Sequence, residues 1–185
     1  MQRKLVVVVN GHPRSGKDTV VNGLSEVLKE FGWLTGAISS IDPIRNVLRG
    51  LGIPVDKKTT AERDLLANMK ACLEGYDNWV TRSCVSSALA RLDIGYSGKD
   101  VIFLHVREPA AIALTKELLP DSVEFLTIFV DRAAAEQVST NAADANVENY
   151  PYDISLGNNG DLASLGASLV ALAAKINQST AKVAA

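Results

Sequence analysis

The residues with the clearest capacity for chemistry form a short glycine-rich segment near the N-terminus. It has the pattern G-x-x-x-x-G-K, with Gly11 and Gly16 at its ends and Lys17 directly after. Such glycines let backbone N–H groups converge on phosphate oxygens, while the lysine reaches the β- and γ-phosphates. The pattern therefore predicts a loop that binds a nucleoside triphosphate, with ATP as the expected one. The residues expected to bind it are Gly11, His12, Pro13, Arg14, Ser15, Gly16, Lys17, Asp18 and Thr19.

The residue after the lysine departs from the usual pattern of this loop. Ser or Thr normally binds Mg²⁺ there, but this chain has Asp18, followed by Thr19. A carboxylate beside a triphosphate is repelled unless a cation lies between them. Carboxylate oxygens are good ligands for Mg²⁺. We therefore expect Asp18 to bind Mg²⁺, directly or through water.

A second group of polar residues follows the second expected strand, where an acceptor would bind. Asp42 can accept the proton of an attacking hydroxyl, and it also fits a helix N-cap before Pro43. Arg45 lies about one helical turn further on and can hold an acceptor phosphate. Arg63, on the next expected helix, belongs either to a solvated charged face or to a second anion contact.

The ends of two later strands carry the remaining candidates. His105 stands where many P-loop proteins have an Asp that binds Mg²⁺. Its presence there favours Asp18 as the metal ligand. Arg107 follows at the carboxyl edge of the sheet, where ligands bind. Arg132 opens the polar segment 131–149, which we expect to be a short lid whose single arginine assists transfer. The expected catalytic residues are Lys17, Asp42 and Arg132.

The order of the elements predicts an α/β fold. Apolar, strand-like runs alternate with segments of helical spacing, which favours a three-layer P-loop domain with a five-stranded parallel sheet flanked by helices. The expected strands are 5–9, 34–41, 101–106, 125–130 and 152–156. The expected helices are 17–31, one from 42, 60–73, 79–92, 108–119 and 162–176. We expect one domain over 1–185, with a helical excursion at about 42–95 and a loop at 95–100.

Composition narrows the class of protein. The chain has 185 residues, 47% of them hydrophobic, and a net charge of −2, which does not mark a nucleic-acid binder. Basic residues exceed acidic ones over 1–70 and are outnumbered over 71–185, so an anionic ligand is expected on the N-terminal half. Cys72 and Cys84 have no metal-site spacing and fit free thiols. Without a membrane-length apolar run, we expect a soluble, cytoplasmic protein.

Several segments together resemble a known group of enzymes. The loop GHPRSGKDT resembles the phosphate loop of phage deoxynucleoside monophosphate kinases, which share the Lys-Asp-Thr ending. The segments SSIDPIR, AERDLLANMK, YDNW, HVREP and NAADANVENYPYDISLGNNGDL extend this resemblance to small phage-associated P-loop kinases over most of 5–165. That superfamily also contains phage 5-hydroxymethyluracil DNA kinases, which phosphorylate the hydroxymethyl group of a modified base in DNA. The resemblance implies a kinase acting on a nucleotide or on DNA in the infected host cell.

Which acceptor we expect depends on whether the attacking group needs a base to remove its proton. An unactivated alcohol benefits from a carboxylate such as Asp42, whereas a nucleotide phosphate is already an anionic nucleophile. A short lid also leaves room for a polymer. We therefore expect transfer to 5-hydroxymethyluracil in DNA, with a deoxynucleoside monophosphate as the alternative acceptor. A P-loop NTPase switch without an acceptor is the third possibility, and the oligomeric state is not indicated.

Overall fold

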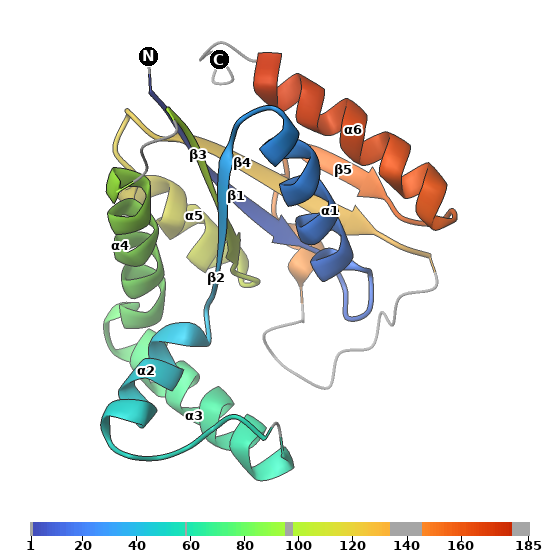
Figure 1. The fold of residues 1–185 in the computed structure, drawn as a ribbon. Coiled ribbons are helices and arrows are strands. Elements are labelled where there is room, and N and C mark those ends of the chain that lie inside the picture. The colour runs from blue at the N-terminus through green and yellow to red at the C-terminus, as the bar shows by residue number, and fades with distance from the viewer. Residues whose placement is uncertain (1, 58, 95–97, 134–145, 179–185) are drawn as a thin grey trace.

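The fold is a parallel sheet covered by helices on both faces (Figure 1). The computed structural model describes residues 2–57, 59–94, 98–133 and 146–178. The strands are β1 (Arg3–Asn10), β2 (Leu34–Ser39), β3 (Lys99–His105), β4 (Glu124–Asp131) and β5 (Ile154–Gly157). Their order is β2-β3-β1-β4-β5, and every pair is parallel. The predicted five-stranded, three-layer α/β fold is confirmed.

Over the described residues, six α-helices and one short 3₁₀ helix lie between the strands or, for the last of them, after β5. They are α1 (Lys17–Glu30), α2 (Asp42–Gly50), α3 (Thr60–Asp77), α4 (Trp79–Ile94), α5 (Pro109–Leu118), η2 (Val147–Asn149) and α6 (Leu162–Gln178). Helices α2 to α4 all lie between β2 and β3 in the chain, within the expected excursion. Most of the expected lid, at 134–145, lies outside the described residues. Among those described, no helix is long and apolar enough to cross a membrane.

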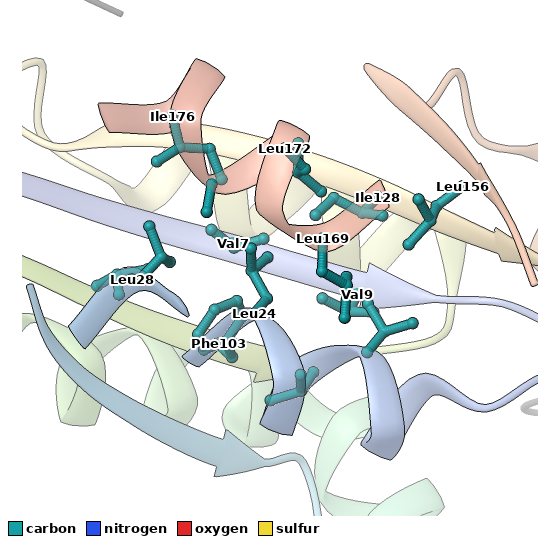
Figure 2. Close-up of a cluster of buried hydrophobic side chains, with 14 of the residues drawn as sticks. Val7, Val9, Leu24, Leu28, Phe103, Ile128, Leu156, Leu169, Leu172 and Ile176 are labelled. Atoms are coloured by element: carbon teal, nitrogen blue, oxygen red, sulfur yellow. The ribbon is translucent and has the colours of Figure 1, made fainter. Parts of the chain in front are cut away.

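The central strand β1 is buried on both faces because its side chains alternate between two hydrophobic clusters. Val7 and Val9 pack with residues of α1 and α6, including Leu24 and Leu169 (Figure 2). Val6 and Val8 face the other cluster, which is built mainly from α2, α4 and α5. A strand flanked by two others and covered on both faces leaves only its carboxyl end open, and the glycine-rich loop follows there.

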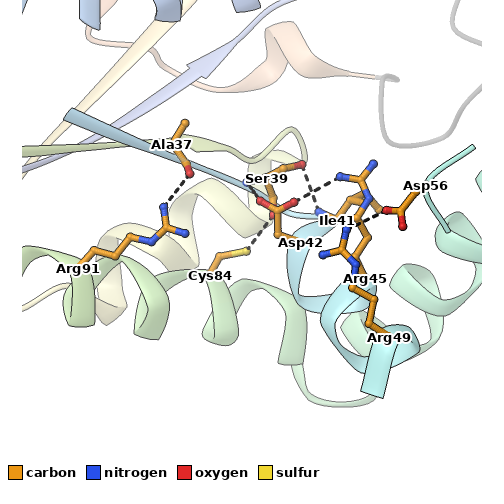
Figure 3. A network of polar contacts seen from close by, with 9 residues as sticks. All are labelled: Ala37, Ser39, Ile41, Asp42, Arg45, Arg49, Asp56, Cys84 and Arg91. Atoms are coloured by element: carbon orange, nitrogen blue, oxygen red, sulfur yellow. Dashed lines mark hydrogen bonds and ion pairs between the residues drawn. The ribbon is translucent and has the colours of Figure 1, made fainter. Parts of the chain in front are cut away.

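The outer edge of β2 is closed by side chains instead of another strand (Figure 3). Arg91 of α4 donates to the backbone oxygen of Ala37 at 3.0 Å. The backbone N–H of Ser39 donates to Asp42 Oδ2 at 2.8 Å, and the Cys84 thiol lies 3.9 Å from the Ser39 oxygen. Helices α2 and α4 thus satisfy the groups that an unpaired edge would expose. This contact also fixes the carboxylate of Asp42 at the end of β2.

Several boundaries differ from the sequence expectation. The helix expected to stop at 73 continues to Asp77, because Asn78 adopts a left-handed conformation (φ 50°) and donates to the Glu74 oxygen as a C-cap. Its start is fixed by a capping box between Thr59 and Glu62. The loop expected at 95–100 is wrong at its end, since Lys99 and Asp100 belong to β3.

Shortening Leu24 to alanine is expected to lower the free energy of unfolding by about 2–5 kcal/mol, because this side chain is fully buried beneath β1. Urea denaturation followed by circular dichroism measures the change. Leu162→Ala is the control, since Leu162 is 78% exposed and should shift stability by no more than about 0.5 kcal/mol. Equal losses in the two variants would contradict this assignment of the core.

Candidate active site

The glycines of the loop are required by close contacts with neighbouring elements. A Cβ on Gly11 would lie 2.4 Å from the backbone oxygen of Val130 in β4. A Cβ on Gly16 would lie 2.4 Å from Asn158 Nδ2, and the Gly16 backbone is left-handed (φ 93°). Any larger residue would push the loop away from β4 and β5 or strain its backbone. The loop is therefore held against the sheet at both ends.

Inside the loop, the lysine side chain lies across the backbone. Lys17 Nζ donates to the backbone oxygens of Gly11 and His12, both at 2.7 Å. Asn158 Nδ2 donates to the Ser15 oxygen at 2.8 Å, which anchors the loop to the end of β5. Gly16 is the N-cap of α1, so the positive end of that helix dipole faces the same space. A cation, a bent loop and a helix N-terminus together fit a phosphate-binding site.

Two side chains of the loop, Ser15 and Asp18, bear on whether it fits a nucleotide with Mg²⁺. The Ser15 hydroxyl is buried and has no hydrogen-bond partner among the described residues. Asp18 is exposed in the first turn of α1. Over the described ranges, no group of three or more His, Cys, Asp or Glu side chains converges on a metal site. Mg²⁺ usually takes one or two carboxylates and completes its shell with phosphates and water, so a single acid at the loop fits such an ion.

Asp42 lies at the start of α2 but does not cap it, which corrects the predicted N-cap. The cap position is Ile41, and Asp42 is already in the first helical turn. Its Oδ2 accepts instead from the Ser39 N–H, and its Oδ1 lies 3.4 Å from Arg45 Nη1 (Figure 3). The side chain is 44% exposed. Since a carboxylate has about four lone-pair positions, it keeps acceptor capacity toward solvent.

His105 lies between the loop and Asp42. In the register of β2 and β3 it pairs with Ser39, and the Ser40 N–H donates to its backbone oxygen at 3.3 Å. Alternation along β3 puts its side chain on the α1 face, with Phe103. Burial lowers the pKa of His105. The charges that act on its imidazole are, in order of size, Asp18, Arg107, Asp42 and Lys17. These four predicted residues are therefore near enough for their charges to act on the same imidazole.

Of the five predicted arginines, all within the described residues, Arg107 alone belongs to this group. Arg63 is exposed on α3, and Arg132 is exposed directly after β4. Neither is among the charges that act on His105. Helix α3 nevertheless contacts the start of α5, because Lys70 forms an ion pair at 2.5 Å with Glu108, the N-cap residue of α5. The roles expected for both arginines stay predictions.

A buried amide that the sequence reasoning missed connects the loop to the backbone at Arg107 and to Tyr152. Asn10 is fully buried, and its Oδ1 accepts from the Gly11 N–H at 2.9 Å. Its Nδ2 donates to the Arg107 backbone oxygen at 2.8 Å and to the Tyr152 hydroxyl at 2.7 Å. That hydroxyl donates to the Val147 oxygen at 2.6 Å. The sequence offers one signal for Asn10: it is a polar residue at the end of an otherwise apolar strand, directly before the loop.

A half-buried group of rings supports the same side of the loop. His12 meets Phe129 of β4 edge to face, with ring centroids 5.8 Å apart, and Phe129 contacts Tyr152 at 5.1 Å. His12 Nε2 also lies 3.9 Å from a carboxylate oxygen of Glu148 in η2. The second loop residue is therefore held by packing against β4.

Comparison with solved structures supports the fold. The APS kinase of Mycobacterium tuberculosis in complex with AMPPNP and APS matches with a TM-score of 0.54 and 15% identity, covering 93% of this chain and 98% of that one. A variant of the same enzyme matches with a TM-score of 0.54 and 17% identity over the same shares. At this identity the likeness shows the fold alone. No protein-family model and no curated protein matches the chain.

The His105 imidazole should titrate below 6.5, its ordinary value, because burial disfavours the charged ring. As the pH falls below 6.5, the unfolded chain takes up a proton on His105 before the folded protein does. The free energy of unfolding should therefore decrease as the pH falls from 6.5 toward the folded-state pKa of His105. Histidine NMR signals followed over pH, with His105→Asn to assign the resonance, measure this shift. A midpoint above 6.5 would contradict the described burial.

Proposed function

We propose that this protein is a kinase that transfers the γ-phosphoryl group of ATP to an alcohol, and that the alcohol is the hydroxymethyl group of 5-hydroxymethyluracil in DNA. The observation that carries the proposal is the position of Asp42. Its carboxylate is fixed beside the end of β2, and both it and Lys17 of the loop act on the His105 imidazole. The proposed base and the proposed phosphate-binding loop therefore lie at the same carboxyl edge of the sheet.

The donor half of the reaction uses the loop at 11–19. Phosphate oxygens would replace the Gly11 and His12 carbonyls as the partners of the Lys17 ammonium. AMPPNP, an ATP analogue in which nitrogen replaces the β–γ bridging oxygen, is bound by the APS kinase of the same fold, which supports ATP as the donor. Asp18 would hold Mg²⁺, which when bound offsets the negative charge of the β- and γ-phosphates. Arg132 would approach the transferring group from the end of β4.

In the transfer step, the acceptor oxygen forms a bond to the γ-phosphorus while the bond from that phosphorus to the β–γ bridging oxygen breaks. ADP leaves with the electron pair, and the hydroxyl proton passes to Asp42 and then to water. Lys17 stabilises the negative charge on the moving group. Arg45 and Arg107 would position the acceptor, and Arg63 would add an outer anion contact.

The charges around Asp42 favour an alcohol over a phosphate as the nucleophile. A monophosphate dianion placed at this carboxylate would be repelled, and Arg45, 3.4 Å away, offsets only one negative charge. The proposal of DNA as the substrate rests on the resemblance to the phage kinases and not on the surface charge of this protein. Arg49 of α2 forms an ion pair with Asp56 at 2.8 Å, which offsets its positive charge.

Purified protein with radiolabelled ATP and Mg²⁺ should label an oligonucleotide that contains 5-hydroxymethyluracil and leave a matched thymine oligonucleotide unlabelled. Single-stranded DNA should react faster than duplex, because a paired base must first be turned out of its stack. Label on free deoxynucleoside monophosphates alone would replace this proposal with a nucleotide kinase. ATP hydrolysis that no acceptor changes, with no labelled product, would indicate an NTPase switch.

A further inference from the structure

An open groove of about 390 Å³ lies beside the unpaired edge of β2, between α2 and α4. Its walls carry two opposite charges, an aromatic ring and several neutral polar groups. The lining residues used below are Asp42, Asn46, Trp79, Ser83, Ser87 and Arg91. The groove begins at the carboxylate proposed as the base, so whatever fills it lies next to the reaction centre. Figure 3 shows Asp42 and Arg91 on the two sides of this region.

The groove exists because of a stripe of residues along α4. Trp79, Ser83, Ser87 and Arg91 are each four positions apart, so they lie along one side of the helix. Between the indole and the guanidinium, the two serines have side chains too small to reach α2. The sequence thus leaves a hollow with hydroxyl groups on its wall and a flat ring at one end. The apolar residues of the lining, Ile38, Pro43 and Val47, come from β2 and α2.

The two charged groups are held in place by the edge of β2. Asp42 accepts from the Ser39 N–H, and Arg91 donates to the Ala37 oxygen. These anchors are two residues apart along the strand, a separation of roughly 7 Å. Closing the strand edge accounts for one hydrogen bond of each side chain. A carboxylate with about four lone-pair positions and a guanidinium with five N–H groups retain the capacity to bind a ligand.

We propose that this groove binds the ring of the acceptor, an uncharged planar heterocycle that carries a hydroxyl group. The ring lies against Trp79 with a carbonyl oxygen facing Ser83, and its hydroxyl reaches Asp42. The rest of the nucleoside extends along the groove toward Ser87 and Arg91. The inference rests on the proposed function for the role of Asp42. It adds the site that selects the acceptor and the orientation of the ring within it.

The size and charge of the groove exclude other acceptors. Its volume is near the lower end of ligand pockets, which run from about 300 to 1,000 Å³, so it fits one nucleoside but not a stacked run of bases. A base in DNA would therefore enter singly, turned out of its stack. The lining contains one carboxylate and one guanidinium, so it has no excess positive charge for a phosphate at the reactive end.

The test fills the groove without touching the catalytic groups. Ser87→Leu places a large side chain in the hollow, and Ser86→Leu places the same side chain one residue away on the exposed surface of α4, outside the lining. The probe is 5-hydroxymethyl-2′-deoxyuridine, followed by tryptophan fluorescence. The chain has two tryptophans, of which Trp33 is 3% exposed in the core while Trp79 lines the groove. Trp79→Leu identifies the source of the signal.

We expect the nucleoside to change the fluorescence of the wild-type protein and of Ser86→Leu, and to leave that of Trp79→Leu unchanged. Ser87→Leu should weaken binding about ten-fold or more, or roughly 1.4 kcal/mol. Circular dichroism and ATP binding should match in Ser86→Leu and Ser87→Leu, which separates blocking of the groove from misfolding. Equal nucleoside affinity in these two variants, or a fluorescence change that survives Trp79→Leu, would overturn the proposal. Because this readout is binding, it is independent of whether phosphate transfer is found.

Discussion

The parallel pairing of β3 with both β1 and β2 is the constraint on which the rest of the structure depends. It places the glycine-rich loop after β1 on one side of His105 and the turn that carries Asp42 on the other. Because parallel strands end at the same edge, the glycine-rich loop and the Asp42 carboxylate lie at one edge of the sheet, on either side of the end of β3. The buried valines of β1 and the helices on both faces serve to keep that edge in register.

Two polar contacts turn this shared edge into a defined site. Asn10 links the first loop residue to the backbone at Arg107 and to Tyr152, so the loop and the end of β3 cannot shift independently. Asp42 is held by the Ser39 N–H, so its carboxylate is positioned by the strand rather than by helix capping. Such preorganisation reduces the reorganisation that a transfer reaction requires.

The sequence was a good guide where the signal is local. An apolar run, a glycine-rich turn and a segment of helical spacing predicted β1, the loop and α1, since each feature depends on adjacent residues. The bond from Ser39 to Asp42 was missed because an aspartate before a proline matches a helix cap equally well. The role of Asn10 depends on partners 97 and 142 residues away, Arg107 and Tyr152, which no local pattern reveals. The stripe on α4 is visible in the sequence only once α2 is known to lie opposite it.

The central claim is that Asp42 takes the acceptor proton at the edge that also binds ATP. Asp42→Asn keeps the shape of the side chain and removes the base, so ATP affinity should stay unchanged while transfer to 5-hydroxymethyluracil DNA falls about 100-fold or more. Asp56→Asn, which changes an exposed acid paired with Arg49, is the matched control and should transfer phosphate at the wild-type rate. Undiminished transfer by Asp42→Asn under single-turnover conditions would contradict this account.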